Sequence, residues 1–139
     1  MIRTIQPTDA KAIRDISEFS LGYKTTEAVI ERQIAKLISD NRHFIRVYED
    51  DETHTVAGFI HAEAYELLYK EPGFNILGLA VLPEYQHRGI GKQLLQAVEA
   101  EAAARITVLS ALIPENIGRK PMRFTNTAAI TIPNCKNVL

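Results

Sequence analysis

A short turn that contains two glycines, placed between a strand and a helix, is the strongest chemical signal in this sequence. The apolar segment from Asn75 to Leu82 is followed by Gln86-His87-Arg88-Gly89-Ile90-Gly91. Apolar residues then recur at helical spacing at Ile90, Leu94, Leu95 and Val98. The glycines let the backbone approach a ligand, and the helix N-terminus offers unpaired N–H groups and the positive end of its dipole. The pattern predicts a pyrophosphate site, and the alternative is a tight turn without a ligand.

Two other kinds of phosphate-binding loop fit this sequence poorly. A dinucleotide-binding βαβ unit requires a third glycine and an acidic residue about twenty positions further on, after a second strand, and neither is found. A P-loop requires Gly-Lys-Ser or Gly-Lys-Thr, which does not occur in the chain.

The whole segment from Ile76 to Leu95 resembles the central motif of the GCN5-related N-acetyltransferases. The resemblance consists of a strand that ends in an apolar-x-Val step, a Pro-Glu-Tyr turn, and then Gln, two residues, Gly, one residue and Gly. It implies acetyl-CoA as the cofactor, with its pyrophosphate on backbone N–H groups and its pantetheine arm paired with the strand before the turn. It also implies that a strand N–H near Val81 stabilises the thioester oxygen. The cofactor-binding residues implied are Leu79, Ala80, Val81, Gln86, His87, Arg88, Gly89, Ile90, Gly91 and Lys92.

Acetyl transfer to an amine requires a base, because an alkylammonium is protonated near neutral pH. In the predicted strand from Thr55 to Leu68, strand periodicity places Phe59, His61, Glu63 and Tyr65 on one face. Glu63 is the candidate base and His61 the second candidate. The alternative is that both side chains lie on a solvated sheet face without a catalytic role.

Composition favours a single cytoplasmic domain. The 139 residues carry a net charge of −1, with basic and acidic residues interspersed, so nothing favours nucleic acid or an anionic membrane as a partner. No apolar run approaches membrane-spanning length and the N-terminus lacks a signal-peptide pattern. Cys135 is the single cysteine, and no histidine, cysteine and carboxylate set has metal-ligand spacing, so we expect neither an internal disulfide nor a metal.

The remaining patterns predict an α/β fold with a mixed, mainly antiparallel sheet flanked by helices, which is the acyl-CoA N-acyltransferase fold that the resemblance implies. Helical stripes and caps predict two helices before residue 42, one with Ile13, Ile16 and Phe19, the other beginning at Thr25 or Thr26 and ending near Asp40. The predicted strands are Ile2–Gln6, His43–Glu49, Thr55–Leu68, Asn75–Leu82 and Arg105–Ser110.

The sequence after Ser110 departs from the family. Relatives carry a late helix with a Phe-Tyr pair, whose Tyr protonates the departing CoA thiolate, and this pattern is absent here. The codons of residues 112–139, read one base earlier, can encode a similar pattern. We therefore interpret residues 1–110 as an incomplete acetyltransferase domain and 111–139 as an out-of-frame tail. The alternative is a divergent tail, in which Thr127 to Ile132 forms a strand.

Three functions remain open at this point. The first is acetyl transfer from acetyl-CoA to a primary amine of a small molecule or peptide, by direct attack. The second is an acetyl-CoA-binding remnant that lacks catalysis, and the third is an interaction protein that keeps only the fold. We also expect self-association, because a strand at 106–109 without its neighbour would present an unpaired edge. The acceptor cannot be identified, because its specificity would lie in loops such as Leu21–Thr26 and Leu67–Phe74.

Overall fold

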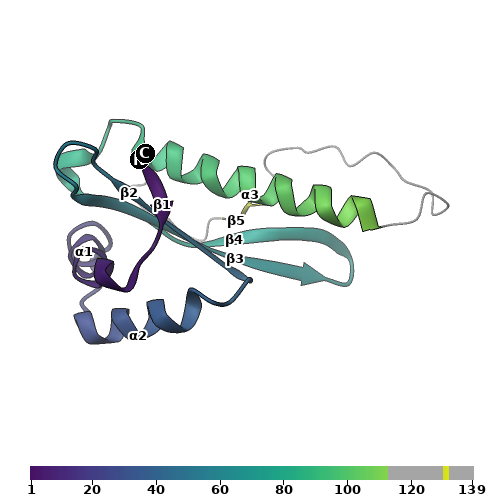
Figure 1. The fold of residues 1–139 in the computed structure, drawn as a ribbon, viewed down its shortest axis with the longest axis horizontal. Helices are drawn as coiled ribbons and strands as arrows, with labels where there is room; N and C mark the ends of the chain where they lie inside the picture. The colour runs from purple at the N-terminus through teal and green to yellow at the C-terminus, as the bar shows by residue number, and fades with distance from the viewer. Residues whose placement is uncertain (113–129, 132–139) are drawn as a thin grey trace.

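The computed structural model describes residues 1–112 and 130–131, which form one five-stranded sheet with helices on both faces (Figure 1). The strands follow one another in sequence order across the sheet, and each pairs antiparallel with the next except for the last pair, which is parallel. They are β1 (Ile2–Thr4), β2 (His43–Glu49), β3 (Val56–Leu67), β4 (Lys70–Val81) and β5 (Ile130–Thr131).

The helices before β2 cover one face of the sheet, and the long helix after β4 covers the other (Figure 1). The first group is η1 (Pro7–Asp9), α1 (Ala10–Ile16), a π-helical turn η2 (Ser17–Leu21) and α2 (Glu27–Leu37). Gly22 ends η2 with a left-handed φ of 73°, and the Thr26 hydroxyl caps α2 by accepting a hydrogen bond from the Val29 amide. The second group is a short turn η3 (Pro83–Tyr85) and α3 (Ile90–Leu112).

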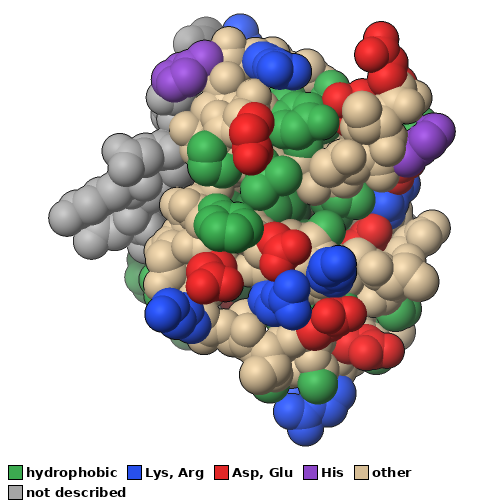
Figure 2. All heavy atoms as spheres, turned by 90° about the vertical axis from the view of Figure 1, so that its left-hand side faces the viewer, with side chains coloured by type: hydrophobic (Ala, Val, Ile, Leu, Met, Phe, Trp, Pro, Cys, Tyr) green, Lys and Arg blue, Asp and Glu red, His purple; other side chains and the backbone are tan. Residues whose placement is uncertain are grey.

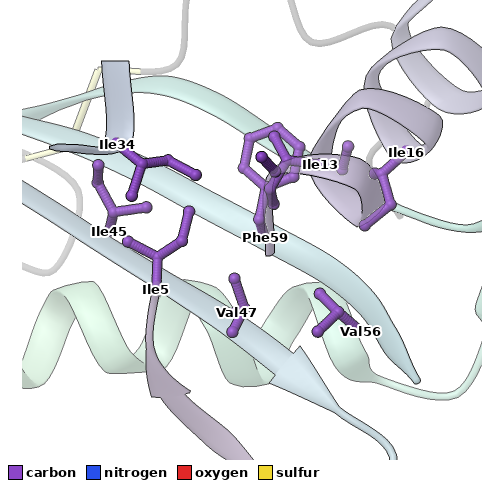
Figure 3. Packing of buried hydrophobic residues seen from close by; sticks show 10 residues of the cluster. Ile5, Ile13, Ile16, Ile34, Ile45, Val47, Val56 and Phe59 are labelled. Carbon is purple, nitrogen blue, oxygen red and sulfur yellow. The ribbon is translucent and has the colours of Figure 1, made fainter. Parts of the chain in front are cut away.

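Alternation along β2 and β3 divides the core into two layers. Ile45, Val47 and Phe59 point to the side of α1 and α2, where they pack against Ile13, Ile16 and Ile34 (Figure 3). The residues between them in the chain, including Phe44 and Ile60, pack against α3 through Ile90, Leu94 and Val98. The sheet is thus anchored on both faces, which holds the start of α3 in a fixed position beside the end of β4.

The predicted fold class, the β2–β3 hairpin and the helix that begins after Thr26 are confirmed. The predicted strand Arg105–Ser110 is wrong, because α3 continues through Leu112. Between Gly91 and Pro114 the chain has no glycine or proline, so nothing breaks the helix there, and Arg105 donates to Glu101 one turn earlier at 2.9 Å. The prediction relied on the strand propensity of the β-branched residues after Arg105. That propensity is weak, and the helix continues through these residues.

Three smaller predictions also need correction. Phe19 does not belong to the buried stripe of the first helix, because the π-helical turn leaves it 67% exposed. The second helix ends at Leu37, before the predicted end near Asp40. The strand edge at 106–109, from which self-association was expected, does not exist, so that argument fails. Most of the tail lies outside the described residues, although β5 falls within the segment Thr127–Ile132 that the alternative interpretation assigns to a strand.

Candidate functional site

The turn from η3 to α3 has an unusual backbone conformation at two positions. Gly89 has a φ of 78° and His87 a φ of 64°, both in the left-handed region. The sequence pattern indicates this conformation at Gly89, where the absence of a Cβ makes it inexpensive. It gives no such indication at His87, where a side chain makes the conformation uncommon.

This turn presents a run of unpaired backbone N–H groups. Within residues 1–112 and 130–131, the amides of His87, Arg88, Gly89, Ile90, Gly91 and Lys92 donate to no acceptor. The first helical hydrogen bond runs from the Gln93 amide to the Gly89 carbonyl at 3.1 Å. The amide of Gln86, by contrast, donates to the Pro83 carbonyl at 3.3 Å. Six consecutive donors without an acceptor in the described part of the chain, at the positive end of a 23-residue helix, form an anion-binding surface.

The end of β4 exposes an edge beside this surface. The Leu82 amide donates to the Ala57 carbonyl at 2.7 Å, toward β3. Because backbone groups alternate in direction along a strand, those of Val81 and Leu79 point away from β3. β5 pairs with Phe74 and Asn75, and no described strand pairs with Leu79 to Val81 on that side. A ligand can therefore add to this edge as an extra strand would.

The carbonyl of Val81 on this edge is already occupied. It accepts hydrogen bonds from the Ser20 hydroxyl at 2.7 Å and from the Gln86 side-chain amide at 3.1 Å. The Gln86 side chain thus serves to link the turn to β4. Ser20 brings the end of η2 against the same point, so η2 meets the β4–α3 connection at Val81, which lies 61 residues later in the chain.

A cavity of about 110 Å³ lies where these segments meet. It includes nine of the ten cofactor-binding residues implied by the resemblance, and the exception is Arg88, whose guanidinium lies 5.1 Å from the centre of the Tyr85 ring. Figure 2 views the molecule from this end, where hydrophobic side chains gather between charged ones. The lining residues are Ser20, Leu21, Leu79, Ala80, Val81, Tyr85, Gln86, His87, Gly89, Ile90, Gly91 and Lys92.

Tyr85 fixes the turn to the neighbouring hairpin. Its hydroxyl donates to the Asp50 carboxylate in the β2–β3 connection at 3.0 Å. The backbone N–H groups of Glu52 and Thr53, and then the Tyr85 hydroxyl, stabilise that carboxylate and lower the pKa of Asp50. The pocket wall formed by Tyr85 is therefore anchored at both the ring and the hydroxyl.

The predicted base lies on the sheet face of α1 and α2, as strand alternation requires. Glu63 is partly buried, is paired across the sheet with His43 on β2 and with Asn75 on β4, and has no hydrogen bond to a described residue. His61 is partly buried two residues earlier on the same face, and its Nε2 atom lies 2.9 Å from Nδ1 of His43. Burial, followed by the nearby His43, lowers the pKa of His61 to about 4.

Sequence analysis did not identify Ser20 and Leu21 as lining residues or His43 as a partner of His61. The signal for His43 was available, because the hairpin register could have been counted from the acidic turn. No signal pointed to Ser20, whose position depends on the π-helical turn. Among the residues that the structure describes, no group of three or more histidine, cysteine, aspartate or glutamate side chains could hold a metal ion, and no helix is long and apolar enough to span a membrane.

Comparison with solved structures finds acetyltransferases that share this fold. A GNAT family acetyltransferase from Staphylococcus aureus superposes with a TM-score of 0.68 at 17% identity, covering 98% of this chain and 87% of that chain. The PaiA N-acetyltransferase from Thermoplasma acidophilum in complex with coenzyme A gives 0.61 at 20% identity, covering 76% and 72%. An aminoglycoside antibiotic 6'-N-acetyltransferase from Acinetobacter baumannii gives 0.63 at 20% identity, covering 86% and 93%. These likenesses show the fold, and no curated protein sequence matches the chain.

A family model matches the amino-acid sequence of this chain. The family model described as "Acetyltransferase (GNAT) family" matches residues 10–120, which include the strand, the turn with its free N–H groups and the helix that follows. This chain therefore belongs to the acetyltransferase (GNAT) family.

Proposed function

We propose that the chain transfers the acetyl group of acetyl-CoA to a primary amine of a small molecule or peptide. The observation that carries the proposal is the run of six N–H groups from His87 to Lys92 that have no acceptor among the described residues, set directly beside an edge of β4 with which no described strand pairs. The pyrophosphate of acetyl-CoA requires several hydrogen-bond donors and a positive potential. The pantetheine arm, which contains amides, requires a strand edge with which it can pair. Both requirements are met within one cavity.

The backbone of β4 supplies the groups for the arm. The outward N–H and C=O of Leu79 and the outward N–H of Val81 are available to it, whereas the Val81 carbonyl is held by Ser20 and Gln86. An outward N–H at Leu79 or Val81 is also suited to stabilise the thioester oxygen as it becomes anionic during attack. Binding and charge stabilisation thus come from main-chain groups that the sheet holds rigid.

The acceptor amine needs to lose a proton before it attacks. We propose that Glu63 accepts this proton, because its carboxylate is partly buried, has no hydrogen-bond partner among the described residues and lies on the same strand pair as the β4 edge. The amine nitrogen then attacks the thioester carbon, the C–S bond breaks, and the CoA thiolate leaves with a proton from solvent or from a side chain.

A second candidate is binding of acetyl-CoA without turnover. It is favoured by one specific observation, that the sequence contains no tyrosine after Tyr85, so the acid expected from a later helix is absent. The free donors and the β4 edge would still bind the cofactor in that case.

Release of CoA thiol from acetyl-CoA, measured with the purified chain and a panel of primary amines, distinguishes the two candidates. The proposal predicts amine-dependent thiol release that falls by about a hundredfold or more in Glu63→Gln. An amide of the same shape keeps the packing of Glu63 but cannot accept the proton. Binding of acetyl-CoA with no thiol release for any amine would contradict transfer and support the second candidate.

A further inference from the structure

Two histidines on adjacent strands form a hydrogen-bonded pair that the proposed chemistry has not used. Nδ1 of His43 on β2 and Nε2 of His61 on β3 are 2.9 Å apart, and the ring centroids are 5.1 Å apart at an interplanar angle of 46°. They are diagonal neighbours, because Ile45 lies opposite His61 and Glu63 lies opposite His43. Neutral imidazoles can form this bond only if one nitrogen donates and the other accepts.

The pair lies across the sheet from the part of β4 where the proposed function places the thioester. Gly78 is the β4 residue opposite His61, and the Phe59 ring packs over it, with Cε2 of Phe59 3.4 Å from the point that a Cβ of Gly78 would occupy. An extra residue in β4 between Gly78 and Ile76 shifts the register at this point. Gly78 directly precedes Leu79, one of the two residues whose outward N–H the proposed function offers to the thioester oxygen.

Burial of the ring is the main reason that His61 stays neutral. Burial and the neighbouring His43 both disfavour its protonated form, while Glu63 on the same strand favours it, and the net effect lowers the pKa of His61 to about 4. The β4 residues opposite His61 and Glu63 are Gly78 and Asn75, which carry no charge. At neutral pH His61 therefore has one unprotonated ring nitrogen, which accepts a proton only as the proton on its other nitrogen passes to His43.

We propose that His61 and His43 form a proton relay that returns Glu63 to its carboxylate form after each acetyl transfer. This inference rests on the proposed function. In the starting state Nε2–H of His61 donates to Nδ1 of His43. The proton that Glu63 took from the amine passes to Nδ1 of His61 through a water molecule, since Glu63 makes no direct hydrogen bond to His61. The Nε2 proton of His61 then moves to Nδ1 of His43, and the Nε2 proton of His43 leaves to solvent, so one proton enters and one leaves. Both rings are then in the opposite tautomer, and each exchanges its Nδ1 proton for a proton from water on Nε2, which restores the starting state before the next turnover.

Both histidines act through Glu63, so they are positioning and relay residues. The relay requires a ring with two nitrogens at each position. His61→Gln places an amide near the original Nε2 and His43→Asn places one near the original Nδ1, so each variant can keep the contact but cannot carry a proton across. The matched control is His54→Asn, which removes a histidine in the β2–β3 turn whose φ of 56° asparagine tolerates.

The experiment measures amine-dependent thiol release in the full chain at low and high concentrations of imidazole buffer, with KM for acetyl-CoA determined in parallel. We expect kcat to fall at least about tenfold in His61→Gln and in His43→Asn at low buffer, with KM unchanged and with recovery at high buffer. Because the two act as a unit, the double variant falls no further than either single variant. The His54→Asn control keeps the kcat of the parent.

Three results would overturn the relay. Unchanged kcat in both single variants would show that the pair carries no proton. A loss of kcat that buffer does not restore would show that the pair is structural. A parent chain that releases no thiol with any amine would contradict the proposed function itself, and with it the relay, whereas the first two results leave the proposed function intact.

Discussion

The pH dependence of stability tests the environment of His61 most sharply. In the unfolded chain a histidine takes up a proton with a pKa of 6.5, whereas the folded chain resists protonation of His61 until about pH 4. Between these two values acidification therefore stabilises the unfolded state, and the free energy of unfolding falls as the pH is lowered. The contribution of His61 is fully present above pH 6.5 and is lost progressively toward pH 4.

The magnitude follows from the same two values. At about 1.4 kcal/mol for each pH unit, the interval corresponds to roughly 3 kcal/mol. Solvent still reaches part of the His61 ring, so screening reduces this, and we expect about 2 kcal/mol. The main causes are burial of the ring and the proximity of His43.

Urea unfolding followed by circular dichroism at several pH values, for the parent and for His61→Gln, provides the measurement. Other titrating groups are common to both chains and cancel in the comparison. We expect the parent to lose about 2 kcal/mol more than the variant between neutral pH and about pH 4. An equal loss in both chains would refute the assignment of a buried, neutral His61.

Three further predictions concern the pocket wall and the tail. Ser20→Ala removes the 2.7 Å hydrogen bond to the Val81 carbonyl, so urea unfolding should show a loss of about 1 kcal/mol, and an unchanged stability would argue against that contact. Tyr85→Phe removes the 3.0 Å hydrogen bond to Asp50, which should raise the pKa of Asp50 as followed by NMR, and a pKa equal to that of the parent would contradict the anchor. We propose that residues 111–139 are read out of frame, so the coding DNA read one base earlier should contain the Phe-Tyr and Gly-Tyr codons, and their absence would disprove the frameshift.

Sequence reasoning succeeded where short-range rules decide the structure. The glycine turn before α3, the cap at Thr26 and the alternation in β2 and β3 depend on residues that are close in the chain. The turn between β4 and α3 was therefore located correctly, and nine of the ten implied residues line one cavity, while pyrophosphate binding by this turn stays a prediction.

The reasoning failed where long-range packing decides the structure. The π-helical turn that turns Phe19 outward places Ser20 against β4. The helix across Arg105 was missed for a different, local reason, because strand propensity was given more weight than the absence of a helix-breaking residue. The left-handed conformation of His87 is set by the turn as a whole, and the residue type at this position does not indicate it. The contact between His43 and His61 depends on the register of two strands and on side-chain direction, which spacing alone does not provide.

Calorimetric titration of acetyl-CoA into the parent, Gly89→Asn and Gly89→Asp tests the central claim most directly. Asparagine and aspartate have the same shape and both tolerate the left-handed φ of 78°, so the two variants differ in charge alone. The account predicts that the parent binds, and that Gly89→Asp binds at least about tenfold more weakly than Gly89→Asn because its carboxylate repels the pyrophosphate. A parent that does not bind, or equal affinities for the two variants, would contradict a pyrophosphate site at this turn.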